Sequence, residues 1–263
     1  MDQIRAALGS SLLAVEGVSV HFGGIVALDG VSFDIAPGQI AGLIGPNGAG
    51  KTTLFNCLSR LYRFQSGDIV FDGRPLQAIP RHGIAAAGIG RTFQNLALFR
   101  TMTVGDNVML GRHCRTRSGF FSNALRLPRV AREERASAEK VRDLIVFLDL
   151  VSMAGTRVSE LPFGTQKRVE LARALASEPR LLLLDEPASG LNHEEVNELG
   201  KLIRDIRDRL GVTVLLVEHH MSLVMSVSDK VVALNFGRKI AEGTPTEVQQ
   251  HPEVVRAYLG TSA

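Results

Sequence analysis

The chain has 263 residues and a formal net charge of +3, with 45% hydrophobic and 22% charged residues. These values are ordinary for a folded protein, and the charge is too small to indicate nucleic-acid binding by itself. No apolar run approaches the ~20 residues needed to span a bilayer, and the N-terminus, with Asp2 and Arg5, does not resemble a signal peptide. The length allows one large domain or a core with an inserted subdomain.

Alternating apolar residues and punctuating glycines predict strands at the start of the chain, over residues 14–22 and 27–35. A short apolar run over residues 40–44 predicts a buried strand, and residues 52–58 predict the first turns of a helix. Between this strand and this helix lies the sequence Gly45–Thr52, which fits the pattern G-x-x-x-x-G-K-[ST].

A glycine-rich loop in this context predicts a phosphate-binding site. Its backbone N–H groups can form a nest for phosphate oxygens, the helix N-terminus adds partial positive charge, and Lys51 adds a full charge. The hydroxyl of Thr52 can complete the ligand shell of Mg²⁺. We therefore expect the chain to bind a nucleoside triphosphate through Gly45, Pro46, Asn47, Gly48, Ala49, Gly50, Lys51, Thr52 and Thr53.

Further short strands are predicted over residues 68–71 and 88–93, and the second is followed by Gln94. An uncharged amide can ligate Mg²⁺ or orient water without changing its protonation state. Gln94 is therefore a candidate for both roles.

Between residues 99 and 175 the pattern becomes helical. Apolar residues at i, i+3 and i+4 spacing predict one amphipathic helix whose buried face consists of Ala138, Val141, Leu144, Ile145 and Leu148. The preceding segment, residues 112–135, is basic, and residues 119–121 and Pro128 are expected to interrupt it. It can be a solvated linker and helix face, or a contact with a partner or with acidic lipid headgroups.

The run of leucines at 181–184 predicts a fully buried strand that ends at Asp185 and Glu186. In α/β sheets, ligands gather at the carboxyl ends of strands. We expect the Asp185 carboxylate to point into the ligand crevice and to hold Mg²⁺ through water. Glu186 is the candidate general base for the attacking water.

A second amphipathic helix is predicted from six apolar residues, and a second buried strand over residues 212–217. The helix residues are Val196, Leu199, Leu202, Ile203, Ile206 and Leu210. The strand ends at His219, which can donate a hydrogen bond to the γ-phosphate; His220 is the weaker candidate. Buried strands that alternate with helices predict a parallel sheet covered on both faces, with the helical stretch inserted beside it.

The order of these motifs resembles the ATPase subunits of ABC transporters. Residues 161–175 look like the signature region of that family, residues 189–192 look like its D-loop, and Phe22 looks like the aromatic residue that stacks on adenine. Shorter matches point to the LivG-type ATPases of branched-chain amino-acid importers; they lie at residues 22–24, 91–94, 98–99, 102–104, 218–219, 221–225 and 256–260.

The resemblance implies an α/β fold: a RecA-like core with an antiparallel β-subdomain and an inserted α-helical subdomain. Residues 12–94 and 178–245 would form the core with the β-subdomain, residues 95–177 the helical subdomain, and residues 246–263 a helical tail. It also implies ATP and Mg²⁺ as cofactors, a second ATPase subunit, two membrane permease subunits and a periplasmic binding protein. ATP between the two ATPases would close the dimer, and Gly164 would contact the nucleotide of the opposite subunit.

The chain departs from the family's signature L-S-G-G-Q, because Pro162 stands at the serine, Phe163 at the first glycine and Thr165 at the glutamine. Proline has neither a hydroxyl nor an N–H group to offer a phosphate. We therefore expect this signature to make a weakened contact with the γ-phosphate held by the opposite subunit. Of the two composite sites, the one that uses this signature is expected to be the slower.

Two other classes are consistent with a phosphate loop. A soluble ABC-type ATPase acting on nucleic acid or ribosomes would need a duplicated cassette or a long coiled-coil insertion. A P-loop kinase or GTPase would need an acceptor-binding lid or a guanine-reading N-K-x-D stretch. The sequence has none of these. Cys57 and Cys114 follow no disulfide or metal spacing, which suits a cytoplasmic location. The cargo stays open between branched-chain amino acids, urea, amides and lipids, since no residue here reads the solute.

Overall fold

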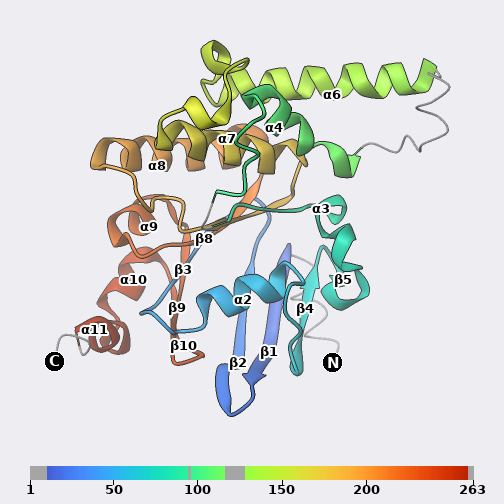
Figure 1. Ribbon diagram of the computed structural model, residues 1–263. Coiled ribbons are helices and arrows are strands. Elements are labelled where there is room, and N and C mark those ends of the chain that lie inside the picture. Colours follow the sequence, from blue (N-terminus) through green and yellow to red (C-terminus); the bar gives the residue numbers. More distant parts are fainter. Residues whose placement is uncertain (1–10, 94–95, 116–127, 260–263) are drawn as a thin grey trace.

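The computed structural model describes residues 11–93, 96–115 and 128–259. These residues form two sheets, with helices against them and a mainly helical region at the top of the view in Figure 1. The two sheets differ in direction: one is antiparallel throughout, and the other is parallel except at one edge.

The antiparallel sheet has four strands and lies toward the bottom of Figure 1. In the order of pairing, the strands are β2 (Ile25–Ile35), β1 (Leu13–Phe22), β4 (Ser66–Phe71) and β5 (Arg74–Pro75). A tight turn with Gly23 at φ 58° joins β1 to β2, a conformation that glycine adopts at no steric cost. The three strands predicted for this part of the chain are confirmed with shifts of one or two residues.

The second sheet has six strands in the order β10-β9-β3-β8-β7-β6. Their bounds are β10 (Arg238–Gly243), β9 (Lys230–Asn235), β3 (Ile40–Ile44), β8 (Thr213–Val217), β7 (Leu181–Asp185) and β6 (Ile89–Arg91). All neighbours pair in parallel except β10 with β9. The predicted parallel sheet of buried strands is therefore confirmed.

Strand β6 is shorter than the predicted strand over residues 88–93. Thr92 still donates its backbone N–H to the Leu183 carbonyl oxygen at 3.0 Å. The N–H of Phe93 instead donates to a carboxylate oxygen of Glu170, at 3.1 Å. The strand ends because a side chain from a helix takes the next backbone donor.

Some α-helices lie on the two faces of the parallel sheet, and others pack on helices of the region at the top of Figure 1. The α-helices are α2 (Lys51–Leu58), α3 (Ile84–Ala87), α4 (Val104–Leu110), α6 (Pro128–Phe147), α7 (Phe163–Ala176), α8 (His193–Leu210), α9 (Met221–Val227), α10 (Pro245–Gln250) and α11 (Pro252–Leu259). The 3₁₀ turns are η1 (Leu76–Ala78), η2 (Arg81–Gly83), η3 (His113–Arg115), η4 (Val151–Met153) and η5 (Val158–Glu160).

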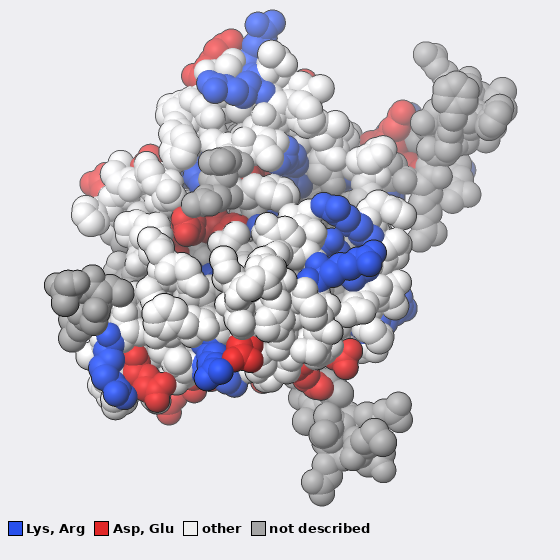
Figure 2. Space-filling model, turned by 60° about the horizontal axis from the view of Figure 1, so that its bottom comes forward, with Lys and Arg blue, Asp and Glu red and all other residues white. Residues whose placement is uncertain are grey.

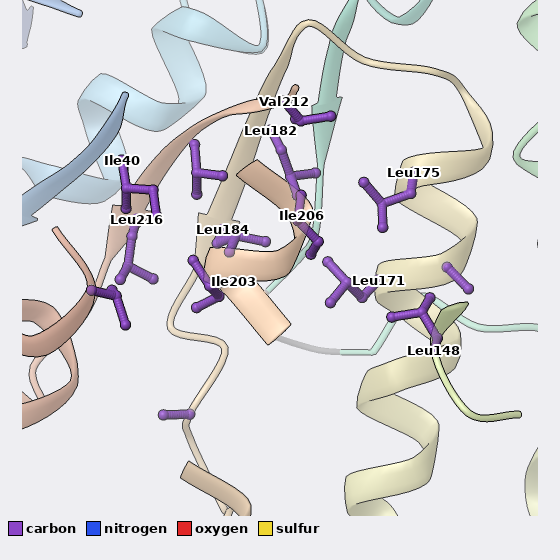
Figure 3. Close-up of a cluster of buried hydrophobic side chains, with 14 of the residues drawn as sticks. Ile40, Leu148, Leu171, Leu175, Leu182, Leu184, Ile203, Ile206, Val212 and Leu216 are labelled. Atoms are coloured by element: carbon purple, nitrogen blue, oxygen red, sulfur yellow. The ribbon is translucent and has the colours of Figure 1, made fainter. Parts of the chain in front are cut away.

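Alternate residues of the parallel strands belong to two hydrophobic clusters. Leu182 and Leu216 lie in the cluster drawn in Figure 3, beside Ile203 of α8. Their chain neighbours Leu183 and Leu215 lie in the other cluster, with residues of α2 and of the antiparallel sheet. The sheet thus buries both faces, as expected for parallel strands that read as continuous apolar runs.

Helix α6 confirms the predicted amphipathic helix and corrects one detail of its buried face. Val141, Leu144, Ile145 and Leu148 are buried, but Ala138 is exposed and Ser137 is buried in its place. Pro128, which was expected to interrupt the basic segment, stands at the start of this helix. It is the first residue of α6, where proline needs no N–H partner and already has helical φ. Residues 116–127 of the basic segment lie outside the described residues.

In α8, the predicted apolar face is confirmed except at its end, where Leu210 is 42% exposed. None of the helices in the described ranges is both long and apolar enough to cross a membrane. Acidic and basic side chains are interspersed along the lower edge of the surface in Figure 2, and Lys and Arg side chains gather to the right of its centre.

Candidate nucleotide site

The loop Gly45–Thr52 connects the carboxyl end of β3 to the first turn of α2 (Figure 1). Gly45, Gly48 and Gly50 have φ values of 151°, 81° and 100°. A Cβ at Gly45 would lie 2.2 Å from the Leu234 carbonyl oxygen, and one at Gly50 would lie 2.6 Å from that of Ala27. The loop backbone therefore has both the conformation and the close packing that only glycine allows.

Lys51 is the first residue of α2, and its side chain is buried over the loop. Its Nζ donates to the Gly45 carbonyl oxygen at 2.6 Å and to that of Pro46 at 3.0 Å. Burial lowers the pKa of the Lys51 ammonium, while Asp185 and Glu186 act in the opposite direction. Thr52, next along the helix, is exposed. This arrangement places the cation and the hydroxyl at the helix N-terminus, as an anion site requires.

Asp185 ends β7, is 5% exposed and pairs with Arg91 at the end of β6. Its Oδ2 accepts a hydrogen bond from the Arg91 guanidinium at 2.8 Å. The sequence prediction of a carboxylate facing an open crevice omitted this partner. A buried carboxylate needs such a partner, since an unpaired charge in the interior is costly.

Glu186 follows Asp185 and has φ 47°, the left-handed region that favours glycine. Its backbone N–H donates to the Val217 carbonyl oxygen at 2.9 Å. Its Oε2 lies 3.9 Å from Nδ1 of His219. Non-glycine residues in this conformation concentrate at functional sites, because the surrounding structure must hold them there.

Glu218 is a site residue that the sequence prediction missed. It is fully buried between β8 and the histidines, and Oε1 accepts the N–H of Ala188 at 2.7 Å. Its Oε2 accepts the N–H groups of His219 at 3.0 Å and His220 at 3.2 Å. One carboxylate thus fixes the chain after Glu186 and the chain at His219. The visible signal was a carboxylate directly before two histidines at a strand end.

The side chains of the two histidines are less constrained than their backbone. The side chain of His219 is 53% exposed, and its ring centroid lies 4.7 Å from that of His220. His219 Nδ1 lies 3.9 Å from both Glu186 and Glu218. The structure therefore brings His219 beside the candidate base, as the strand order predicts.

Phe22 lies at the end of β1 and is 46% exposed. Its ring makes an edge-to-face contact with Tyr62, with centroids 5.2 Å apart and planes at 73°. An exposed ring fixed by a second aromatic offers a face for a flat heterocycle. Tyr62 was not predicted from the sequence, because nothing in its neighbourhood distinguishes it from a surface residue.

The signature region forms the start of α7. Pro162 is the N-cap residue and offers no side-chain hydrogen bond, whereas α4, α8 and α10 each begin with a capping box. Phe163 is 46% exposed and packs on Gly190, where a Cβ would lie 2.9 Å from the Phe163 ring. A Cβ at Gly164 would lie 2.5 Å from Oε1 of Glu195. The nearest neighbours of Gly164 are thus Glu195 of α8 and Leu191 just before that helix, not the phosphate loop of the same chain.

Gln94 lies outside the described residues, but the segments on both sides of it contact α7. Glu170, buried in α7, accepts the N–H of Phe93 at 3.1 Å, and the backbone of Ala97 also contacts its carboxylate. Burial raises the pKa of Glu170, and these backbone contacts act in the opposite direction. Arg173 donates to the Ala97 carbonyl oxygen. The helix that begins at the signature therefore anchors both flanks of Gln94.

The C-terminal helices also reach the loop. Tyr258 of α11 packs against the hydrophobic cluster of Figure 3, and burial raises the pKa of its hydroxyl. The backbone of Gly45 lies beside that hydroxyl and acts on its pKa in the opposite direction. A cavity of about 500 Å³ lies between the phosphate loop and α11, lined by residues that include Asn47, Phe236 and Arg256.

These residues fit a nucleotide with a divalent cation. The loop presents bare backbone where a Cβ would collide, and Lys51 lies over it. Within the described ranges, no hydrogen bond is made to Oδ1 of Asp185, the oxygen that Arg91 does not use. Carboxylate and hydroxyl oxygens are the ligands that Mg²⁺ prefers.

Comparisons with known proteins agree with this geometry. The ABC transporter family matches residues 28–189, and the family described as branched-chain amino acid ATP-binding cassette transporter matches residues 238–263. The chain belongs to the ABC transporter family, as an ATP-binding cassette.

Similar proteins match over nearly the whole chain. The high-affinity branched-chain amino acid transport ATP-binding protein LivG of Salmonella typhimurium is 42% identical, covering 96% of this chain and 99% of LivG. BraF of Pseudomonas aeruginosa, described in the same words, is also 42% identical, over 95% and 98%. The crystal structure of the ADP conformation of MJ1267, an ATP-binding cassette of an ABC transporter, has a TM-score of 0.83 and 29% identity, covering 95% of this chain and 99% of that one. The predicted family and fold are confirmed.

Proposed function

We propose that the chain is the ATP-binding and ATP-hydrolysing subunit of an ABC importer for branched-chain amino acids. The observation that carries the ATPase part is the position of Glu186: a carboxylate in a left-handed conformation, next to Asp185 and 3.9 Å from His219. The cargo rests on the similarity to LivG and BraF. Import of urea, amides or lipids is the alternative that keeps the same site.

The phosphate loop and its flanks would bind ATP. Lys51 would exchange its bonds to the Gly45 and Pro46 carbonyls for phosphate oxygens, while the loop N–H groups hold the same phosphates. Phe22 would hold the adenine ring. Thr52 and Asp185, the latter through water, would hold Mg²⁺, with Gln94 as a further ligand. Bound Mg²⁺ would neutralise charge on the phosphates.

Hydrolysis would depend on Glu186 and His219. Glu186 would accept a proton from the attacking water, and His219 would donate a hydrogen bond to the γ-phosphate. Gln94 would orient the water. Glu218 keeps the backbone on both sides of this pair in place through three N–H groups.

The nucleotide site would be completed by a second ATPase subunit, either a copy of this chain or a related one. Gly164 at the start of α7 would contact the nucleotide held by the other subunit, and ATP binding would draw the two subunits together. Hydrolysis would remove the γ-phosphate that joins them. The pair would act on two membrane permease subunits from the cytoplasmic side of the membrane. A periplasmic binding protein would deliver the solute to these permeases from the other side.

The same proposal assigns the parts of the chain. Residues 12–94 and 178–245 would form the catalytic core with the β-subdomain, residues 95–177 the helical subdomain, and residues 246–263 the C-terminal tail. The contacts of Glu170 with both flanks of Gln94 support a mechanical link from the nucleotide to the signature helix.

Replacing Glu186 with Gln tests the catalytic assignment. We expect the variant to bind ATP as the unaltered chain does and to lose most hydrolysis, on the order of 100-fold or more, since an amide cannot accept the water's proton. Phosphate release and nucleotide binding are measured on the same preparation. The exposed Glu139 on α6 provides the control Glu139→Gln. Hydrolysis near the unaltered rate in Glu186→Gln would show that Glu186 is not the base.

Uptake measurements test the cargo. The chain is expressed with its permease subunits and binding protein, and uptake of labelled leucine is compared with uptake of urea. ATP-dependent uptake of leucine is expected. Uptake of urea alone would retain the ATPase site and reject the cargo.

A further inference from the structure

Arg91 stands outside the proposed ATPase mechanism, yet it joins three parts of the nucleotide site. It is the last residue of β6, and its side chain is only 9% exposed. One guanidinium nitrogen, NH2, donates to Oδ2 of Asp185 at 2.8 Å. The other, NH1, donates to Oδ1 of Asn56 and to Oγ of Ser59, both at 2.9 Å. Asn56 belongs to α2, and Ser59 caps its C-terminus.

Two aromatic rings lie against the same guanidinium. Its central carbon lies 5.7 Å from the ring centroid of Phe55 and 5.2 Å from that of Phe93. Phe55 is a buried residue of α2, and Phe93 is the residue that precedes Gln94. A guanidinium that lies over two aromatic rings is attracted by both of them, which restricts its orientation.

The planar fork explains why arginine stands here. Two nitrogens on opposite arms reach partners in different directions, whereas lysine donates all its hydrogen bonds from one nitrogen. Both members of the Arg91–Asp185 ion pair are also buried, with side-chain exposures of 9% and 6%. An ion pair in such a place is rarely the most stabilising choice for a core, because apolar residues of similar volume often serve stability as well.

Asp185 is left with one oxygen for another role. Oδ2 is held by Arg91, and Oδ1 receives no hydrogen bond from the residues described in the structure. Because Arg91 is fixed to α2, and α2 begins at Lys51, the direction of the Asp185 carboxylate is fixed relative to the phosphate loop. The geometry therefore couples the metal-binding carboxylate to the phosphate-binding helix.

We propose that Arg91 is a positioning residue that holds Asp185 by Oδ2 and so directs Oδ1 to the divalent cation that accompanies the nucleotide. This inference rests on the proposed function, in which Asp185 holds that cation. It assigns Arg91 no contact with the nucleotide. The predicted consequence concerns the cation's contribution to nucleotide affinity, and not the affinity of the loop for phosphates.

The test measures binding of a fluorescent ATP analogue to the full chain, first in EDTA and then at rising Mg²⁺ concentrations. For Arg91→Lys we expect unchanged binding in EDTA and a Mg²⁺ requirement about tenfold higher, since loss of a group that orients a metal ligand costs 10- to 100-fold in metal affinity. Arg91→Met, which leaves Asp185 buried without a partner, should show the larger shift and a lower melting temperature.

Two controls separate this effect from a general loss of charge. Arg180→Lys alters an arginine that pairs with Asp72 on the surface, and it should leave the Mg²⁺ requirement unchanged. In an Asp185→Asn background, Arg91→Lys should add nothing further, because residues that act through one another are not additive.

Three results would overturn the inference. One is an unchanged Mg²⁺ requirement in Arg91→Lys. Another is an equal loss of binding in EDTA and in Mg²⁺, which would mean that Arg91 supports the loop as a whole. The third is failure of Arg91→Lys to fold, which would make Arg91 a purely structural residue. The failure of the unaltered chain to bind the analogue at all would instead reject the proposed function.

Discussion

The phosphate loop and the start of α7 differ in how far each is complete within one chain. The loop has partners within the chain: Lys51 bonds to two carbonyls, the nearby Asp185 pairs with Arg91, and Gly45 and Gly50 pack closely on neighbouring backbone. The start of α7 has an N-cap, Pro162, without a side-chain hydrogen bond and an exposed Phe163. The phosphate loop is therefore preorganised to hold a ligand, whereas the start of α7 has polar groups that lack a partner of this kind within the described residues.

The difference is chemical as well as geometric. At the loop, buried charges are matched by opposite charges or by backbone, as interiors require. At α7, Pro162 offers no side-chain cap and the first turn contains no acidic residue of its own, while the Glu195 carboxylate of α8 lies beside Gly164. The N–H groups at such a helix start can bind an anion brought by another molecule. The two halves of the proposed composite site therefore call for different tests.

The largest effect is expected from Lys51→Met, which removes the cation of the completed half. Loss of a charge-assisted hydrogen bond to phosphate costs about 3 kcal/mol, or on the order of 100-fold in nucleotide affinity. Equilibrium binding of ATP measures this loss of affinity, with Lys201→Met at an exposed position of α8 as the control. An affinity close to that of the unaltered chain would mean that the buried Lys51 never leaves the carbonyls of Gly45 and Pro46.

A smaller effect is expected from Glu218→Gln, which tests the link between the Ala188 segment and His219. The amide keeps the size of the side chain, but it turns an NH₂ group toward at least one of three backbone N–H donors. The free energy of unfolding should fall by about 1–3 kcal/mol, as measured by urea denaturation. Hydrolysis should fall more than ATP binding, because the variant displaces His219 and leaves the loop intact.

The control for this variant is Glu139→Gln, at an exposed position of α6. Unchanged stability together with unchanged hydrolysis in Glu218→Gln would show that the three N–H contacts of Glu218 do not hold the site in place.

The smallest effect is expected from Pro162→Ser, which tests the incomplete half. A serine N-cap adds one hydrogen bond to the first turn of α7 and should raise the free energy of unfolding by about 1 kcal/mol at most. In the assembled transporter, turnover should rise by about tenfold or less, the value of one hydrogen bond to the opposite nucleotide. Pro162→Ala is the control, and equal turnover in Pro162→Ser and the unaltered complex would count against a weakened signature.

Sequence patterns predicted most of the sheet and the loop because both follow from local chemistry. The buried strands at residues 40–44, 181–184 and 212–217 are continuous apolar runs, and the loop needs glycine at fixed positions. The predictions were wrong where residues distant in the sequence determine the end of an element. The predicted strand over residues 88–93 ends early because Glu170 takes the N–H of Phe93.

The same reason explains the site residues that were missed. Arg91 and Glu218 bear charges that sequence reasoning leaves unassigned, since their partners lie on other elements of the chain. Asn56 of α2 and Asp185 of β7 are far from Arg91 in the sequence, and only the fold brings them into contact with it. The roles of Gln94, His219 and Phe22 toward a nucleotide stay predictions.

The contact between Tyr258 and the phosphate loop has a consequence for biosynthesis. Gly45 lies near the beginning of the described chain and Tyr258 near its end, so the ribosome makes the loop long before it makes the helix that packs beside it. While synthesis continues, the emerging loop lacks the cover of α11. A nascent chain released before α11 is made would have every residue of the glycine motif, yet it would leave the apolar surface beneath Tyr258 open to water.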